Sequence, residues 1–180
     1  MNQYTFIIYL LPSLISFSIY GLDYTDLEKK DGLYFRKNTK HVFTGKISGE
    51  QKGSITNGKK DGEWIKYWNN RQLTYKGNYN NGVKEGEWLF YRYNGQLNFK
   101  ETYKNGKRNG AFSSFHDNGK LSYNGNFKDD KRQGKWLFYW SNGQVADIGH
   151  FKNNKREGEW LFYYATGQLF KKGNFKNDKR

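Results

Sequence analysis

The side chains that could carry acid–base or metal chemistry are three histidines and 17 carboxylates. His41, His116 and His150 stand far apart in the sequence, whereas a metal site or a catalytic dyad needs several such groups together. The chain has no cysteine, which excludes disulfides, cysteine-bound zinc and thiol chemistry. The sequence Gly-Lys-Ser/Thr is also absent, so nothing indicates a phosphate-binding loop.

The carboxylates recur at fixed positions rather than in clusters. One series is Glu63, Glu87 and Glu159, and the other is Asp61, Glu85 and Glu157. Such columns indicate a repeated structure, in which we expect them to balance nearby lysines rather than act as acid–base pairs. We therefore predict a non-enzymatic protein with no catalytic residue, no bound metal and no cofactor.

The basic residues are also periodic. Lys and Arg number 31 against 17 Asp and Glu, which gives a formal net charge of +14. The predicted basic rim consists of Lys59, Lys60, Lys84, Lys107, Arg108, Lys131, Arg132, Lys155 and Arg156. If these residues occupy stacked turns about 10 Å apart, close to the Debye length at 0.1 M salt, they would attract an anionic membrane surface, a polysaccharide or nucleic acid. The alternative is that the lysines only keep exposed turns soluble.

A repeat of 24 residues organises the chain. Its glycines are Gly62, Gly86, Gly110, Gly134 and Gly158, and the residues two places later are Trp64, Trp88, Phe112, Trp136 and Trp160. The spacing holds without insertion, which is typical of an array of stacked units. Aromatic residues make up 19% of the chain and favour strands.

Each unit is predicted to be a β-hairpin. Asn94-Gly95, Asn118-Gly119 and Asn142-Gly143 indicate two-residue type I′ turns, and a longer connection such as residues 105–110 would join successive hairpins. Counting outward from Asn142-Gly143 places Trp136 opposite Gly149, Phe138 opposite Asp147 and Trp140 opposite Val145. The same count predicts Trp64 over Gly77, Phe112 over Gly125 and Trp160 over Gly173, with each ring covering a bare strand backbone. Trp88 is predicted to face Glu101 instead.

These features predict an all-β fold, an elongated single-layer meander of antiparallel hairpins. The expected parts are a signal peptide at 1–21, a linker at 22–31, a degenerate repeat at 32–61, and five repeats at 62–85, 86–109, 110–133, 134–157 and 158–180. One face of the sheet would collect the rings of Trp64, Trp68, Trp88, Phe90, Phe112, Trp136, Phe138, Trp140, Trp160 and Phe162. These rings could be core packing or, because a single layer leaves them uncovered, an interaction face.

Two stretches resemble a known family. Tyr75 to Trp88, YKGNYNNGVKEGEW, is similar to the MORN repeat, whose core runs Tyr-x-Gly-x-Trp/Tyr-x-x-Gly-x-x-x-Gly. The spacer LFYRYNGQL at 89–97 resembles bacterial MORN-variant proteins, many of them labelled YwqK-family antitoxins. The resemblance spans about residues 31–180 and implies an interaction or scaffolding module.

The last units depart from the family pattern. Asp130, Asn154 and Asp178 replace the glycine found at Gly82 and Gly106, and they fit a left-handed backbone less easily. Asp147 and Lys171 replace an aromatic residue, so we expect a less continuous aromatic stripe there.

The amino terminus carries no charged side chain in residues 1–21. Its weakly polar-to-apolar run, residues 6–20, is shorter than the roughly 20 residues that span a bilayer and suits a signal peptide, although no Lys or Arg precedes it. We expect export to the periplasm, the extracellular space or the cell surface. The alternatives are an uncleaved membrane anchor at 6–20 and a buried strand.

Together these observations predict an exported scaffold module that binds a protein partner or itself, as a homo-oligomer, through the aromatic face. The alternatives are an antitoxin-like neutraliser of a partner toxin and a repeat protein that binds a cell-wall glycan or anionic lipid. Nucleic acid is disfavoured if the chain is exported.

Overall fold

The computed structural model describes residues 21–180. The expected signal peptide, except for Gly21, and the alternative anchor lie outside the described residues. Within residues 21–180, no helix has both the length and the apolar character needed to cross a membrane.

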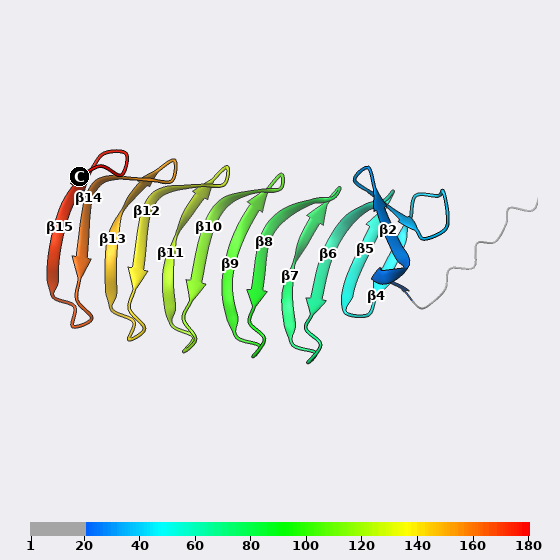
Figure 1. The fold of residues 1–180 in the computed structure, drawn as a ribbon, viewed down its shortest axis with the longest axis horizontal. Helices are drawn as coiled ribbons and strands as arrows, with labels where there is room; N and C mark the ends of the chain where they lie inside the picture. Colours follow the sequence, from blue (N-terminus) through cyan, green and yellow to red (C-terminus); the bar gives the residue numbers. More distant parts are fainter. Residues whose placement is uncertain (1–20) are drawn as a thin grey trace, which may run out of the picture.

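The described chain is almost entirely β-structure. Its strands are β1 (Leu22–Asp23), β2 (Leu27–Lys30), β3 (Leu33–Arg36), β4 (Gly45–Ser48), β5 (Gln51–Thr56), β6 (Lys59–Tyr67), β7 (Leu73–Asn80), β8 (Val83–Tyr91), β9 (Leu97–Lys104), β10 (Lys107–Phe115), β11 (Leu121–Lys128), β12 (Lys131–Tyr139), β13 (Val145–Lys152), β14 (Lys155–Tyr163) and β15 (Leu169–Phe175). Strand β1 and then β4 to β15 follow one another in a 13-stranded sheet that forms a long row (Figure 1). Strands β2 and β3 form a separate pair. The predicted all-β meander is confirmed.

The 24-residue period corresponds to a hairpin of one nine-residue and one shorter strand. The long strands β6, β8, β10, β12 and β14 begin at residues 59, 83, 107, 131 and 155. Each begins three residues before the boundary of the predicted repeat. The predicted repeat boundaries therefore cut through strands.

The turns between hairpins are the type I′ turns. Asn105 and Gly106 have φ angles of 51° and 78°, and Lys104 faces Lys107 directly across the turn. Two residues with positive φ match the twist of the flanking strands, and Asn-Gly suits both positions. The long connection predicted at 105–110 is therefore wrong, because β10 begins immediately after Gly106.

The turns within hairpins have three residues instead of two. The Trp140 N–H donates to the Gln144 carbonyl at 2.8 Å, and the Gly143 N–H donates to the Trp140 carbonyl at 2.8 Å. Only Gly143 of this loop has positive φ, at 94°, as in a type I turn closed by a glycine bulge. The type I′ prediction is wrong here. Tyr139, not Trp140, faces Val145, and Trp140 lies beyond the strand end.

A second bulge sets each tryptophan over the preceding hairpin. Trp136 pairs with Gly149 as predicted, but on its other side Gly134 to Trp136 lie opposite the single residue Gly125. A Cβ on Gly125 would come within 2.3 Å of the Trp136 ring. Trp64, Trp88 and Trp160 cover Gly53, Gly77 and Gly149 in the same way. The predicted pairings of Trp64 with Gly77, Phe112 with Gly125 and Trp160 with Gly173 are confirmed. The predicted cover of these glycines by the same rings is wrong by one hairpin.

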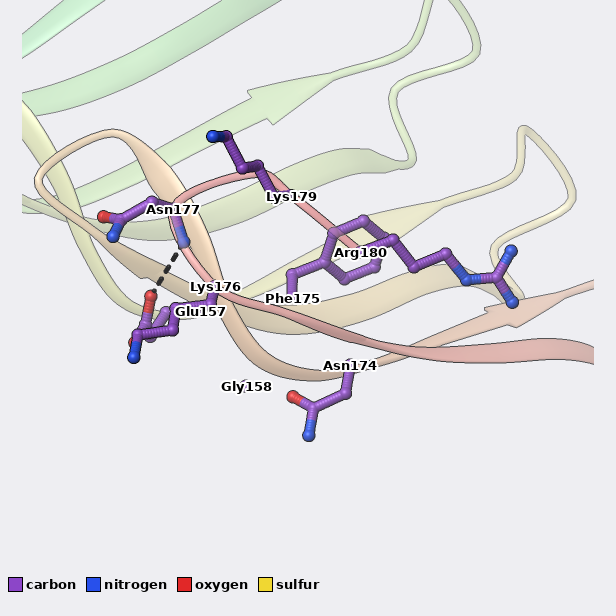
Figure 2. A pocket seen from close by; sticks show the side chains of 8 residues that line it. All are labelled: Glu157, Gly158, Asn174, Phe175, Lys176, Asn177, Lys179 and Arg180. Atoms are coloured by element: carbon purple, nitrogen blue, oxygen red, sulfur yellow. Dashed lines mark hydrogen bonds between the residues drawn. The ribbon is translucent and has the colours of Figure 1, made fainter.

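Gly173 has a different environment. A Cβ there would meet Arg180 and Phe175 rather than an indole ring. Phe175 and Arg180 also line a hollow of about 720 Å³ beside the last turn, shown in Figure 2 with the Glu157 carboxylate near Asn177.

Residues 22–31 are structured rather than the predicted linker. Strand β1 runs parallel to β4, and a single 3₁₀ turn at Tyr24–Asp26 leads into β2. Leu27 is buried with Ile47, Ile55 and Trp64, which adds a second layer at this end of the sheet. The segment therefore caps the array, as terminal repeats of such proteins must.

Candidate interaction surfaces

Half of the predicted aromatic face is core. Trp64, Trp88, Phe112, Trp136 and Trp160 are at most 8% exposed. Trp136 packs edge-on between Phe127 and Phe151, with ring centroids 5.3 and 5.9 Å apart. Edge-to-face packing of this kind stabilises beyond the buried area alone. A partner therefore cannot reach these rings in the folded chain.

Phe90, Phe138 and Phe162 form the half-buried part of the same face. Phe90 stacks on Phe99 at 4.4 Å between centroids. Strand β13 places Asp147 opposite Phe138 and Phe162, and Lys171 lies over Phe162. Burial raises the pKa of the Asp147 carboxyl. The aromatic stripe is interrupted at these two positions, as the sequence predicted.

The exposed aromatic side chains lie at the edge formed by the three-residue loops, which we call the loop edge. This edge exposes Trp68, Tyr93, Trp140, Tyr164 and Phe170 by 36 to 55%. Trp68 and Tyr93 form one patch, with centroids 6.0 Å apart. Tyr164 and Phe170 form another, at 5.0 Å, and the Trp140 ring reaches the Tyr163 carbonyl next to it. Tyr93, Tyr164 and Phe170 were not predicted from the sequence, although their positions beside the glycine loops indicate exposure.

Side chains at the loop edge are held by bonds between hairpins. The Trp140 Nε1–H donates to the Tyr163 carbonyl at 3.0 Å, and His116 Nε2 contacts the Tyr139 carbonyl at 2.9 Å. Arg92 donates to the Phe115 carbonyl and pairs with Asp117, which leaves a polar stretch between the two aromatic patches. His116 therefore has a structural position. No group of three His, Asp or Glu side chains within residues 21–180 could hold a metal ion.

A shallow hollow of about 460 Å³ adjoins the first aromatic patch. Its lining is Gly49, Glu50, Lys52, Tyr67, Trp68, Asn69 and Arg71. The Lys52 ammonium lies 5.3 Å from the centre of the Tyr67 ring. An aromatic wall with charged neighbours suits a polar or peptide group of a partner.

The predicted basic rim splits into two sets. Lys60, Lys84, Arg108, Arg132 and Arg156 turn onto the aromatic core, as shown by Lys60 at 4.0 Å from the Trp64 ring centre and Arg156 at 4.1 Å from that of Phe175. Lys59, Lys107, Lys131 and Lys155 precede them in the strands and so point to the opposite face. The rim residues occupy strand starts and not a long turn, because the turns have only two residues. In the second set, Lys107, Lys131 and Lys155 are exposed and Lys59 is half-buried.

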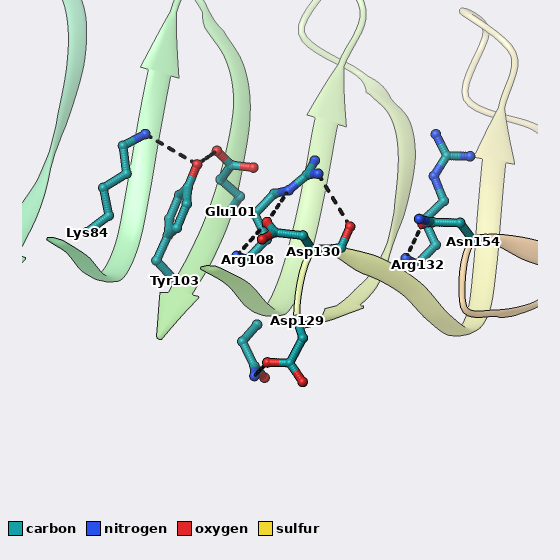
Figure 3. Close-up of polar contacts among 9 residues, drawn as sticks. Lys84, Glu101, Tyr103, Arg108, Asp129, Asp130, Arg132 and Asn154 are labelled. Carbon is teal, nitrogen blue, oxygen red and sulfur yellow. Dashed lines mark hydrogen bonds and ion pairs between the residues drawn. The ribbon is translucent and has the colours of Figure 1, made fainter. Parts of the chain in front are cut away.

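The replacement of glycine in the last type I′ turns adds contacts between hairpins. Asp130 Oδ1 accepts the Arg108 N–H at 3.0 Å and pairs with its guanidinium, while Asn154 Oδ1 accepts the Arg132 N–H at 2.6 Å (Figure 3). Asp178 bonds to Arg156 in the same way, at 2.8 Å. The bond from the Arg108 N–H also lowers the pKa of Asp130. These bonds offset the strain of a left-handed backbone at residues with a Cβ.

The series of Asp61, Glu85 and Glu157 also joins hairpins. Glu85 Oε2 accepts the Asn105 N–H at 2.8 Å, and Glu157 Oε2 accepts the Asn177 N–H at 3.2 Å. These carboxylates satisfy turn amides of the next hairpin rather than balancing lysines. In the other series, Glu87 pairs with Lys100 at 3.8 Å, as the sequence predicted for both series.

Glu101 is the exception within the core. It occupies the position of Gly77 and Gly125 in its hairpin and is 6% exposed, while Phe112 stands where other hairpins have tryptophan. Its Oε1 accepts the Tyr103 hydroxyl at 2.5 Å, and Lys84 Nζ donates to the same hydroxyl at 3.2 Å (Figure 3). Burial and this hydrogen bond raise the pKa of Tyr103. A carboxylate here removes the space that a tryptophan would need.

Restoring the common pair should stabilise the array. The double substitution Glu101→Gly/Phe112→Trp is expected to raise the free energy of unfolding by about 1–2 kcal/mol, because it replaces a buried charge by ring packing. Phe112→Trp alone should be destabilising, since the larger ring meets Glu101. Urea denaturation of the three proteins measures this. A double variant less stable than the parent chain would contradict the assigned pairing.

The charge of Lys60 should make stability depend on pH. Burial lowers its pKa from 10.5 to about 8, so above pH 8 the unfolded chain binds more protons than the folded one. The free energy of unfolding should therefore rise from pH 8 toward pH 10. Above pH 10, the raised pKa of Tyr79, about 12, acts in the opposite direction. Denaturation at pH 7 and 9.5 should show this rise, and Lys60→Met should reduce it. An equal rise in Lys60→Met would contradict the assignment.

A family model described as "MORN repeat variant" matches residues 84–105, 108–129, 132–153 and 156–177. The chain carries four MORN repeats. Each match starts one residue after the start of β8, β10, β12 or β14 and ends at the first residue of the next type I′ turn. A MORN repeat here is thus one hairpin around a three-residue loop. MORN repeats are generally protein- or membrane-interaction modules and are generally non-enzymatic.

No curated protein matches the chain. Among solved structures, a chain of "Crystal structure of GtfA/B complex bound to UDP and GlcNAc" matches at 12% identity with a TM-score of 0.21. The match covers 86% of this chain but 26% of that chain.

Proposed function

We propose that this MORN-repeat chain is a non-enzymatic scaffold that binds a protein partner through the aromatic patches of its loop edge. The observation that supports this most is the exposure of Trp140, Tyr164 and Phe170 by 43, 54 and 54%. Tryptophan and tyrosine dominate the binding energy of protein interfaces, because they bury large area at low entropic cost.

The loop edge holds its exposed side chains in fixed positions, as a scaffold requires. The loop-edge side chains are fixed by bonds to the next hairpin, such as the 2.7 Å bond from the Asn142 side-chain amide to the Ala165 carbonyl. Trp68 and Trp140 are three hairpins apart, or six strands, which is about 30 Å at 4.8 Å per strand. Two patches at a fixed separation could hold two segments of one partner, or two partners.

Export and a toxin partner are narrower parts of the proposal. Export rests on the uncharged residues 1–21, and a toxin partner rests on the resemblance to YwqK-family antitoxins. Amino-terminal sequencing of the chain from native cells tests export. A mature chain that still begins at Met1 would contradict cleavage.

Site-specific photo-crosslinking in the native host tests the loop-edge proposal. A photoreactive residue at Tyr164 should trap one protein, while the same residue at Asn126, exposed on β11, should not. The product at Tyr164 should disappear with Trp140→Ala/Phe170→Ser while the circular dichroism spectrum stays unchanged. Equal products at both positions, or a product insensitive to these substitutions, would contradict the proposal.

A further inference from the structure

The edge opposite the loop edge carries pairs of lysines at four successive type I′ turns. Lys104 faces Lys107, Lys128 faces Lys131, Lys152 faces Lys155 and Lys176 faces Lys179. We call these eight residues the lysine row. All are exposed, and none takes part in an ion pair within residues 21–180.

The arrangement is costly for the fold. Like charges directly opposite each other across a strand pair are destabilising. Most acidic groups near these turns have other partners: Glu85 and Glu157 accept turn N–H groups, and Asp130 pairs with Arg108, while Asp129 at one turn tip accepts only the Asn109 side-chain amide at 3.5 Å. The charge of Lys107 also acts on Asp130, so the turn carboxylates offset part of the repulsion within the lysine row, but none forms an ion pair with a row lysine within residues 21–180.

The lysine row is confined to the last four type I′ turns of the array, from Lys104 to Lys179. The preceding turn has Asn80 facing Val83, and the one before it has Thr56 facing Lys59. From Lys104 onward, each hairpin advances the pair by two strands, or about 10 Å. Four pairs therefore span about 30 Å. This spacing equals the Debye length of about 10 Å at 0.1 M salt and only slightly exceeds the value of about 8 Å at physiological salt, so the potentials of adjacent pairs overlap into one positive line.

We propose that the lysine row binds an extended polyanion, a linear chain that carries carboxylate, phosphate or sulfate groups at regular intervals. A line of paired charges complements such a chain along its whole length. The turn tips themselves carry Asn105, Asp129, Asn153 and Asn177, without an apolar side chain to enter a bilayer. Single-stranded nucleic acid needs rings for base stacking, and the exposed rings lie at the opposite edge. A non-stacking polymer therefore fits the row best.

Heparin and poly-glutamate serve as probes, because they present sulfate or carboxylate on a linear chain. The test variant is Lys107→Gln/Lys131→Gln/Lys155→Gln, which removes one charge from each of three pairs. The matched control is Lys37→Gln/Lys40→Gln/Lys46→Gln, which removes the same charge from exposed lysines of the loop after β3 and of β4. We expect the row variant to lose about tenfold or more in affinity, with a flatter salt dependence. The control should bind like the parent chain.

A second readout is independent of binding. The row variant should melt at a higher temperature than the parent chain, because it relieves repulsion between facing lysines, and the control should not. Equal loss of binding in both variants would overturn the proposal in favour of net charge alone. Stronger retention by vesicles containing phosphatidylglycerol than by either polymer, or a lower melting temperature for the row variant, would also overturn it. Because the loop edge is untouched, the crosslinks at Tyr164 should persist whatever the result.

Discussion

Trp136→Ala is expected to lower the free energy of unfolding by about 3–5 kcal/mol, as large aromatic truncations in packed sites do. The Trp136 side chain is 0% exposed and packs edge-on against Phe127 and Phe151. Its removal also uncovers the Gly125 backbone. Because hairpins are stabilised by their neighbours, the loss weakens both sides of the array. Chemical denaturation followed by far-UV circular dichroism measures the change.

Trp140→Ala is the matched control for this prediction. Trp140 is four residues further along and 43% exposed, so its loss should cost far less than that of Trp136. Lys131→Ala should stay within about 0.5 kcal/mol of the parent chain, as ordinary surface changes do. If Trp136→Ala were nearly neutral while Trp140→Ala were severe, the division between core and exposed rings would be wrong.

Gly125→Ala is expected to be the second large effect, a loss of about 1–3 kcal/mol from a single methyl group. The Cβ would lie 2.3 Å from Trp136, closer than two carbon atoms can approach. The cost is steric rather than conformational, because Gly125 does not have a positive φ angle. Urea denaturation of Gly125→Ala measures the loss.

A suppressor distinguishes this account from general damage to the strand. Trp136→Leu leaves room for the new methyl group, so Gly125→Ala should cost much less in that background. Asn126→Ala, one residue along the same strand and exposed, should be close to neutral. Additive losses in the double variant would show that the ring does not lie over Gly125.

The sequence period was sufficient to predict the hairpins but not the type of each turn. Asn-Gly occurs at both ends of the hairpin, as in Asn94-Gly95 and Asn105-Gly106, and both dipeptides fit a type I′ turn. The structure assigns type I′ only to the second, where both residues have positive φ. Counting from a two-residue turn misplaces Trp140 and Tyr139, but the bulge between Tyr139 and Phe138 shifts the register by one residue. From Phe138 inward the predicted pairs, including Trp136 with Gly149, are therefore correct.

Strand pairing alone could not predict which of the two neighbouring strands each tryptophan ring lies over. Trp136 is paired with Gly149 of β13, yet its ring covers Gly125 of β11. The reason is the bulge at Gly134, which has a φ of 73° and interrupts the pairing between β11 and β12. Likewise, Lys107 and Arg108 are adjacent in a strand, so their side chains point to opposite faces of the sheet, and Arg108 lies over Phe127. The sequence prediction had placed both residues on one rim. The capping segment was missed because residues 22–31 are polar in composition, and only Leu27 among them is buried.

The most direct test of the account is collisional quenching of tryptophan fluorescence, because the account divides the six tryptophans into a buried core and an exposed loop edge. Trp68→Phe/Trp140→Phe leaves Trp64, Trp88, Trp136 and Trp160, which are at most 3% exposed. We predict that acrylamide quenches this variant weakly and that its emission maximum shifts to the blue relative to the parent chain. Quenching as strong as in the parent chain would contradict the buried tryptophan core and the assignment of exposed rings to the loop edge.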